Sequence, residues 1–305
     1  MVRERHHRGM TAAAGLASLA LAAGLAGCGG SSDADAGSSS SAPAGGSTAA
    51  AGAGGSSGVS VPADALLQPG TLTICSDISS PPLEFYTESN KPTGSDVDLG
   101  NAIAKKMGLT AAWANTSFNG IIPALQANRC DAIMSQLYIK PEREKVVDFV
   151  PYMYSGSTFL VKKANATSIK EASDLCGKKA AAETGTTVVE YLQEQSKKCE
   201  SAGRPKIDIR QFEKDPAALQ QLKIGLVDAY GTTVETAAYD SKQNAGQFAT
   251  AGKPFNRIKV GIATRKDSGP LHDALGQALR QVHQDGHYDT IMKKWGLTAD
   301  ALPLG

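Results

Sequence analysis

The sequence contains 305 residues, of which 41% are hydrophobic and 20% charged, the composition of an ordinary globular protein. Its 31 Lys and Arg residues against 30 Asp and Glu residues leave no basic excess, which argues against a partner such as nucleic acid or an anionic membrane surface. A chain of this length can form one large domain or two smaller ones.

The first segment, residues 1–27, has the pattern of a secretory signal peptide. A basic start with three arginines precedes an apolar run over residues 11–26, which is too short to span a bilayer comfortably. The run ends at Leu25-Ala26-Gly27-Cys28, which resembles the bacterial lipobox, in which the cysteine becomes the lipidated first residue of the mature protein. We therefore expect a lipid on Cys28 that anchors the chain at the outer face of the bacterial cell membrane.

The next segment, residues 28–65, is rich in Gly, Ser and Ala and contains few large apolar side chains. Such a segment cannot bury enough apolar surface to offset the entropy lost on ordering. The composition predicts a flexible tether between the lipidated cysteine and the folded part of the chain.

Strands and helices alternate from residue 66 onward. The hydrophobic patterns of the first part predict strands at 72–75, 111–115, 131–134 and 159–161, and helices at 96–107 and from 121 onward. The alternation restarts with strands at 178–182, 207–211 and 226–230 and helices at 186–197 and 217–223. A strand at 258–263 then precedes an amphipathic helix that Gly286 ends.

This order predicts an α/β protein with two lobes. The first lobe comprises residues 66–160 and, after the chain returns, residues 258–305, whereas residues 161–257 form the second. We expect a mainly parallel sheet flanked by helices in each lobe, and two strand-like crossings as the hinge. Ligands of open α/β sheets bind beyond the carboxyl ends of the strands, so we expect the ligand in a cleft between the lobes.

Four cysteines remain besides Cys28, and export would place them in an oxidising compartment where three pairings are open. Cys176 and Cys199 bracket a predicted strand–turn–helix unit and are the favoured disulfide pair. Cys75 and Cys130 each lie beside an apolar strand, where we expect buried free thiols.

A series of motifs between residues 70 and 297 resembles the bacterial extracellular solute-binding proteins of family 3, the polar-amino-acid receptors of ABC importers. The motifs that carry the resemblance are Pro82-Leu83-Glu84-Phe85, Gly94-Ser95-Asp96-Val97-Asp98-Leu99, Phe118-Asn119-Gly120-Ile121-Ile122-Pro123, Asp131-Ala132-Ile133-Met134-Ser135, Pro141-Glu142-Arg143, Gly185-Thr186-Thr187, Gly225-Leu226-Val227-Asp228-Ala229 and Trp295-Gly296-Leu297. The resemblance implies a two-lobed fold of the type II periplasmic binding proteins, a monomer, no cofactor or metal, and a membrane permease with its ATPase as partners. It also implies the disulfide between Cys176 and Cys199.

Arg143 is the first candidate ligand-binding residue, because its guanidinium is a planar fork that binds a carboxylate in a bidentate geometry. The resemblance implies that it holds the ligand carboxylate, whereas an ion pair with a neighbouring acid on a solvated turn is the alternative. Ser135 and Thr187 correspond to family positions that contact the ligand. Turn formation and helix capping are the alternatives for these two residues.

Two further candidates are Phe118 and Asp77. The resemblance implies that Phe118 packs on the ligand, and a core phenylalanine is the alternative. Asp77 follows the first strand and could pair with a cation on the solute, or be a loop residue satisfied by its neighbours.

The chain departs from the family pattern at Tyr138, Lys140 and Thr233. The family usually has a small hydroxyl residue, a threonine and an aspartate at these positions, and the aspartate pairs with the ligand α-ammonium. A buried ammonium needs a carboxylate nearby. Either the solute has no free α-ammonium, or another acid substitutes, with these candidates: Glu235, Glu183 and Asp77. Lys140 could favour a more anionic ligand or turn to solvent.

The sequence therefore predicts a substrate-binding lipoprotein that captures a small carboxylate-bearing solute, an amino acid or a derivative, for an ABC importer. The alternatives are a solute-sensing lipoprotein without transport and a dehydratase-like enzyme, since a few relatives of the family are dehydratases. Catalysis needs a general acid or base over the ligand. The five histidines lie in the signal peptide or in and beside the last helix, away from the expected cleft.

Overall fold

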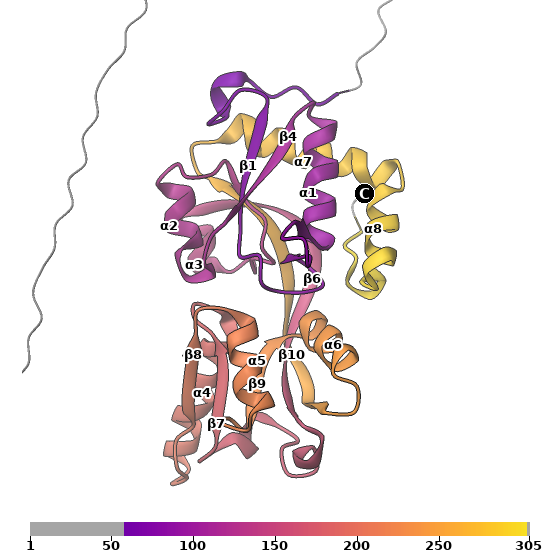
Figure 1. Cartoon of the computed structure of the whole chain (residues 1–305). Helices are drawn as coiled ribbons and strands as arrows, with labels where there is room; N and C mark the ends of the chain where they lie inside the picture. The colour runs from indigo at the N-terminus through magenta and orange to yellow at the C-terminus, as the bar shows by residue number, and fades with distance from the viewer. Residues whose placement is uncertain (1–57, 304–305) are drawn as a thin grey trace, which may run out of the picture. The chain divides into compact units, whose positions relative to one another are not determined.

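The computed structural model describes residues 58–303, which fold into two lobes linked by two long strands (Figure 1). The predicted signal peptide, Cys28 and most of the predicted tether lie outside the described residues. Within residues 58–303, no helix is long and apolar enough to cross a membrane.

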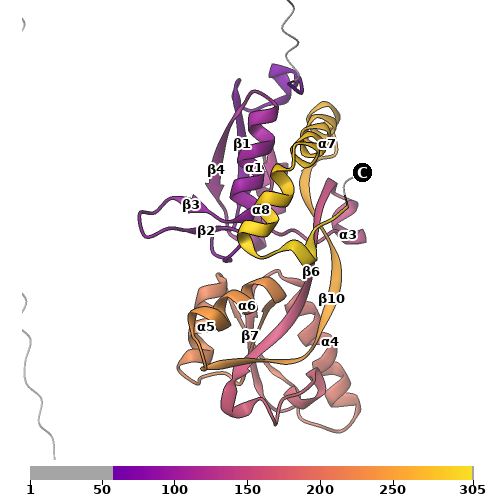
Figure 2. The ribbon, with the colours of Figure 1, turned by 90° about the vertical axis from the view of Figure 1, so that its right-hand side faces the viewer.

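The two long strands are β6 (Val147–Lys162) and β10 (Phe248–Arg265), which pair antiparallel and run through both lobes (Figure 2). Lobe 1 contains these further elements: β1 (Thr71–Ser76), β2 (Phe85–Tyr86), β3 (Pro92–Thr93), α1 (Ser95–Lys106), β4 (Thr110–Asn115), α2 (Ile121–Gln126), β5 (Ala132–Ile133), α3 (Pro141–Glu144), α7 (Gly269–Gln284) and α8 (His287–Trp295). Lobe 2 contains the following: β7 (Lys179–Glu183), α4 (Thr187–Ser201), β8 (Asp208–Phe212), α5 (Asp215–Lys223), β9 (Ala229–Thr233) and α6 (Val234–Gln243). Short 3-10 turns are η1 (Ala63–Ala65), η2 (Phe118–Gly120), η3 (Lys163–Asn165), η4 (Ala172–Leu175) and η5 (Thr298–Asp300).

In the described residues, eight strands form one sheet in the order β4-β1-β5-β10-β6-β9-β7-β8, and β2 and β3 form a separate two-stranded sheet. The outer pairs within each lobe are parallel, as the alternation of strands and helices predicts, whereas β10 pairs antiparallel with β5 and β6, and β6 with β9. The two predicted sheets are thus continuous, because β6 and β10 each contribute one half to either lobe. Register shifts interrupt their pairing between Ala251 and Phe255, between Phe255 and Ile258, and between Val260 and Gly261.

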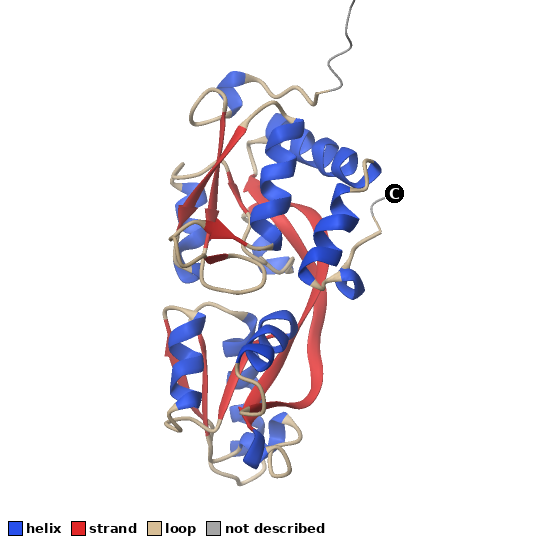
Figure 3. Cartoon of the chain, turned by 45° about the vertical axis from the view of Figure 1, so that its right-hand side comes forward, coloured by secondary structure: helices blue, strands red, loops and turns tan. Residues whose placement is uncertain are grey.

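Helices cover both faces of the sheet in each lobe (Figure 3). In lobe 1, α1, α7 and α8 bury an apolar stripe on one face, and α2 packs with Ile121 and Leu125 on the other. In lobe 2, α4 packs with Val188 and Leu192 on one face, and α5 and α6 cover the opposite face. Each lobe therefore has its own hydrophobic core, so polar side chains can line the cleft between the lobes.

Two disulfides stabilise the lobes. Cys176 and Cys199 are bonded in lobe 2, as the resemblance implies, with Cα atoms 5.6 Å apart. Cys75 and Cys130 are also bonded, with Cα atoms 5.7 Å apart, so the expectation of free thiols at these positions is wrong. Cys75 lies in β1, and Cys130 lies two residues before the start of the neighbouring β5. Strand pairing places them within the reach of a disulfide, which sequence spacing alone does not reveal.

Candidate functional site

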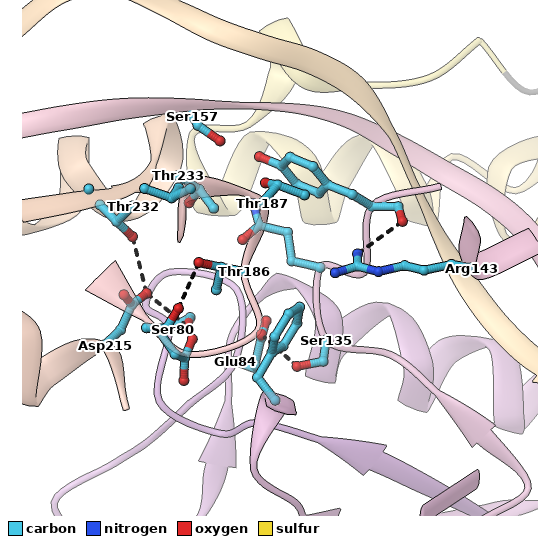
Figure 4. Close-up of a pocket in the computed structure, with 16 residues that line it drawn as sticks. Ser80, Glu84, Ser135, Arg143, Ser157, Thr186, Thr187, Asp215, Thr232 and Thr233 are labelled. Carbon is cyan, nitrogen blue, oxygen red and sulfur yellow. Dashed lines mark hydrogen bonds between the residues drawn. The ribbon is translucent and has the colours of Figure 1, made fainter. Parts of the chain in front are cut away.

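A cleft between the two lobes brings together polar side chains from both (Figure 4). The residues that line it are Ser80, Glu84, Phe118, Ser135, Gln136, Tyr138, Arg143, Ser157, Glu183, Thr186, Thr187, Val188, Asp215, Gly231, Thr232 and Thr233. The set includes four of the five candidates (Arg143, Ser135, Thr187 and Phe118) and Tyr138 and Thr233, which stand at expected ligand positions of the family pattern, whereas Asp77 is not in it.

Arg143 lies in α3, and its guanidinium faces the cleft. Nη1 donates to the carbonyl of Tyr138 at 3.1 Å and Nη2 to the carbonyl of Gly185 in lobe 2 at 3.4 Å. The guanidinium carbon is 5.6 Å from the centre of the Phe118 ring. Within the described residues Arg143 forms no ion pair, and burial lowers its pKa. A partly buried guanidinium whose hydrogen-bond partners are neutral carbonyls is an electrostatic site for an anion.

The N-terminus of α4 lies across the cleft from Arg143. Thr186 is the residue before the helix, and its hydroxyl donates to the Glu183 carbonyl at 2.7 Å. Gly185 has a φ of +83°, and a Cβ there would lie 3.1 Å from the Cα of Asn119 in lobe 1. Thr187 is the first helical residue and lines the cleft. Its position gives an anion both a hydroxyl donor and the positive end of a 15-residue helix.

Ser135 is fully buried and connects two acidic residues. Its hydroxyl donates to Oε1 of Glu84 at 3.1 Å and accepts the backbone N–H of Asp77 at 2.9 Å. Ser135 therefore orients the Glu84 carboxyl. The hydroxyl can serve a ligand only by changing one of these hydrogen bonds.

Tyr138 and Thr233 line the cleft and also form hydrogen bonds with other residues of the protein. The Tyr138 hydroxyl lies 3.0 Å from Oγ of Ser155 in β6, and burial raises the pKa of Tyr138. Thr233 caps α6 by accepting the backbone N–H of Thr236 at 3.2 Å. Lys140 pairs with Glu142 and with Glu190 of lobe 2 and does not line this cleft.

Asp77 lies beside the cleft and is satisfied by protein groups. It accepts the backbone N–H of Phe118 at 2.7 Å and the hydroxyl of Ser79 at 2.6 Å. Nζ of Lys214, in the loop before α5 of lobe 2, is 2.7 Å from the same carboxylate. The cation that pairs with Asp77 thus comes from the protein.

Two acidic residues of the cleft, Glu84 and Asp215, were not among the sequence candidates. Glu84 belongs to the motif Pro82-Leu83-Glu84-Phe85, which supported the resemblance without being assigned a role. Asp215 precedes a proline at a helix start, which is a common capping pattern. Its Oδ2 instead accepts from Thr232 Oγ1 at 3.1 Å and from Ser80 Oγ at 3.3 Å.

The third acid of the cleft is Glu183, one of the three proposed substitutes for the aspartate missing at Thr233. Burial, together with Asp215 and Asp77 nearby, raises the pKa of Glu183 to about 10. Burial also raises the pKa of Asp215 to about 6, and that of Glu84 well above its usual range. Glu235, another proposed substitute, lies behind the cleft and accepts from Gln136 Nε2 at 2.9 Å and Ser155 Oγ at 2.8 Å.

Comparison with known proteins identifies the family of the chain. Residues 72–298 match the model of the bacterial extracellular solute-binding proteins, family 3. The L-cystine-binding protein TcyJ of Escherichia coli (strain K12) is 32% identical over 227 residues, which cover 74% of this chain and 82% of that protein. A solved ancestral arginine-binding protein bound to arginine is 37% identical with a TM-score of 0.69, covering 74% of this chain and 98% of the other.

A second solved structure bears on the enzymatic alternative. The ancestral amino acid-binding protein AncCDT-1, a precursor of cyclohexadienyl dehydratase, is 37% identical with a TM-score of 0.65, covering 74% of this chain and 95% of the other. It is an amino acid-binding protein, and the other two relatives are binding proteins as well. The matched region spans both lobes and every residue that lines the cleft. The chain belongs to the bacterial extracellular solute-binding proteins, family 3.

Proposed function

We propose that this protein is the substrate-binding component of an ABC importer and captures an amino acid between its two lobes. The observation that carries the proposal is the partly buried Arg143 guanidinium, which faces the cleft and whose hydrogen-bond partners are both carbonyl groups. Named relatives that bind cystine and arginine support an amino acid as the ligand. The ligand carboxylate would accept from Arg143 and from Thr187 at the start of α4.

The distribution of charge in the cleft supports a zwitterionic ligand. Arg143 and the α4 N-terminus make one end positive, and three carboxyl groups (Glu84, Glu183 and Asp215) make the other end acidic. A ligand with a carboxylate and an ammonium satisfies both ends at once. Asp215 is the best candidate for the α-ammonium, because it hydrogen-bonds to Thr232, next to the position where the family aspartate is replaced by Thr233.

Binding would favour the closed arrangement of the lobes. Two hydrogen bonds that already cross the cleft run from Ser80 to Asp215 and from Gln136 to Glu235. A ligand held by Arg143 of lobe 1 and Thr187 of lobe 2 adds contacts that exist only when the lobes are together. The closed form would then dock on a membrane permease and its ATPase.

The same proposal includes a lipid anchor. Residues 1–27 would be removed, Cys28 would carry the lipid, and residues 28–65 would tether the lobes to the outer face of the cell membrane. The apolar run and the Leu25-Ala26-Gly27-Cys28 motif support this processing. A Cys28→Ala chain should lose fatty-acid labelling and leave the membrane fraction; unchanged labelling would contradict the anchor.

We propose that the protein binds its ligand without converting it. Turnover of prephenate-like substrates by the purified protein would contradict the binding assignment.

The test of the proposed function is the variant Arg143→Ala. We expect it to lower the affinity for the cognate amino acid at least a hundredfold, because a charge-assisted bidentate contact contributes about 3 kcal/mol or more. Isothermal titration calorimetry against a panel of amino acids measures the loss, and circular dichroism checks that the fold is intact. Unchanged affinity in a folded Arg143→Ala protein would remove the carboxylate assignment.

A further inference from the structure

Two carboxyl groups of the cleft have oxygen atoms that no group of the described protein satisfies. Oε2 of Glu84 and Oε1 of Glu183 are buried and lack a hydrogen-bond partner. Both side chains line the cleft and are almost fully buried, with exposed fractions of 1% for Glu84 and 4% for Glu183. A buried polar atom without a partner costs free energy, so each marks a position where a ligand donor fits.

The two glutamates come from opposite lobes. Glu84 lies just before β2 in lobe 1, where Ser135 fixes its other oxygen at 3.1 Å. Glu183 is the last residue of β7 in lobe 2. Both side chains line the same cleft, and the charge of Glu183 contributes to the raised pKa of Glu84. A cation between them would contact both lobes.

The surrounding charges leave this pair without a cation of its own. Asp96 and Asp77 approach Glu84, and Asp215, Asp77 and Lys214 approach Glu183. Lys214 is the nearest positive group, and its ammonium is already paired with Asp77 at 2.7 Å. The charge that balances the glutamate pair must therefore come from the ligand or from bound protons.

The α-ammonium of an amino acid does not account for all three acids. Asp215 has two protein donors and lies beside Thr232, where the proposed function positions the α-ammonium. Glu84 and Glu183 then still have their unsatisfied oxygens. We propose that Glu84 and Glu183 form a second cation subsite, so that the ligand is an amino acid with a cationic side chain, a guanidinium or an ammonium. This inference rests on the proposed function of the cleft.

The same charges disfavour a ligand with two amino-acid head groups. Such a ligand, L-cystine for example, has a second carboxylate that needs a second cation. Among the residues that line the cleft in the described part of the chain, Arg143 is the one cationic side chain. A second carboxylate would approach Glu84 and Glu183 and be repelled.

Binding of a cationic side chain should also release protons. Because burial and neighbouring acids raise the pKa of Glu183 to about 10, this carboxyl holds its proton at neutral pH. A cation beside it lowers its pKa, and the proton leaves to solvent. A neutral ligand of the same shape leaves the proton in place. Proton release therefore distinguishes a salt bridge from a neutral hydrogen bond at the same position.

The experiment is isothermal titration calorimetry of the mature two-lobed protein with matched ligands. L-Arginine is compared with L-citrulline and L-lysine with L-norleucine, and L-cystine is the fifth ligand. For the pair that binds more tightly, we expect the cationic member to bind about tenfold or more tightly than its neutral partner. Its binding should release about one proton at pH 7, measured in buffers of different ionisation enthalpy.

The variants Glu183→Gln and Glu84→Gln each replace a carboxyl group that can lose its proton to a cationic ligand with a neutral amide of nearly the same shape. We expect each to lower the preference for the cationic ligand about tenfold while binding of the neutral ligand persists, which also shows that the variant is folded. Glu200→Gln is the matched control, since Glu200 is an exposed residue of α4 in the same lobe as Glu183, and it should leave the preference unchanged.

The results separate the two proposals. Binding of L-cystine or of the neutral ligands as tightly as the cationic ones, or a preference unaffected by both glutamine variants, would overturn the second subsite and leave the proposed function standing. The absence of any amino-acid binding would overturn both. Preferential cationic binding that falls in Glu183→Gln and persists in Glu200→Gln would support the subsite.

Discussion

Lys214 contributes a charge to the edge of the cleft from the lobe opposite its partner. Its ammonium is 2.7 Å from Asp77, whose side chain is 1% exposed, while the Lys214 side chain is 31% exposed. The ion pair exists only while the loop before α5 touches lobe 1. It is thus a contact of the closed arrangement that needs no ligand.

Replacing this lysine should weaken closure in the absence of ligand. We expect Lys214→Met to destabilise the unliganded closed form by about 1 kcal/mol, because the partly exposed lysine is screened by solvent. The open fraction should rise about fivefold and increase the radius of gyration measured by small-angle X-ray scattering.

Lys206→Met, at an exposed lysine of the same lobe, is the control and should leave the radius unchanged. Equal radii for the unliganded wild type and Lys214→Met would show that the ion pair does not hold the lobes together.

At the scale of single residues, the sequence predicted the side chains that lie in ordered motifs. Arg143, Ser135 and Thr187 all line the cleft, as expected from their places at or beside the ends of predicted elements, and their contacts with a ligand stay a prediction. The glutamate–aspartate end of the cleft could not, because Glu84 and Asp215 are 131 positions apart in the numbering and meet only when the lobes face each other. The sequence could not show that the cation paired with Asp77 is Lys214 of the protein, because this ion pair depends on a contact between the two lobes.

At the scale of elements, the disulfide between Cys75 and Cys130 links the end of β1 to the segment before β5. The two cysteines are 55 positions apart, and a cross-link that closes a loop of this length removes entropy from the unfolded chain. The bond between Cys176 and Cys199 closes a shorter loop of 23 positions. The longer loop should contribute more to stability if neither bond is strained.

We expect the double variant Cys75→Ala/Cys130→Ala to lose about 4 kcal/mol of unfolding free energy, and Cys176→Ala/Cys199→Ala about 3 kcal/mol. Urea unfolding of each variant measures the loss, and mass spectrometry of the unreduced wild type counts the bonds. Two free thiols at Cys75 and Cys130 in the exported protein would contradict the first expectation.

The positions of most helices and strands were predictable from the sequence, whereas their lengths were harder to predict. The helix predicted at 96–107 is observed as α1 (Ser95–Lys106), because Leu99 and Ile103 mark its buried face and Gly108 ends it. The strand predicted at 159–161 is only the end of β6, which begins at Val147. Pro151 and Gly156 lie within β6 and interrupt the strand pattern, yet pairing with β10 keeps the chain extended. Helix α6 follows from a capping threonine, Thr233, that sequence reasoning treated only as a ligand position.

At the scale of the whole molecule, several buried carboxyl groups make stability depend on pH. Burial raises the pKa of Glu235 to about 7, Asp240 to about 7 and Glu183 to about 10. The folded state therefore holds protons that the unfolded chain loses near pH 4–5. Since the folded state binds more protons, stability is greatest below pH 5 for these groups and falls as pH rises through their folded pKa values.

We expect the melting temperature of the unliganded protein to fall on the order of 5–10 °C between pH 5 and pH 8. Differential scanning calorimetry measures the change at constant ionic strength. A bound cationic ligand should reduce the fall, because it stabilises the deprotonated carboxyls. A melting temperature that rises from pH 5 to pH 8 without ligand would show that these groups are not proton-bound in the folded state.

The two long strands β6 and β10 also govern the order in which the lobes can be completed. Lobe 2 lies between them in the chain and is encoded by one uninterrupted segment. Lobe 1 needs its last strand pairings from β10, where Ala263 pairs with Ile133 and Gly261 with Pro151. If the chain is exported from its N-terminus, lobe 1 emerges first but cannot complete its sheet until β10 has emerged. Lobe 2 can therefore fold before the sheet of lobe 1 is complete.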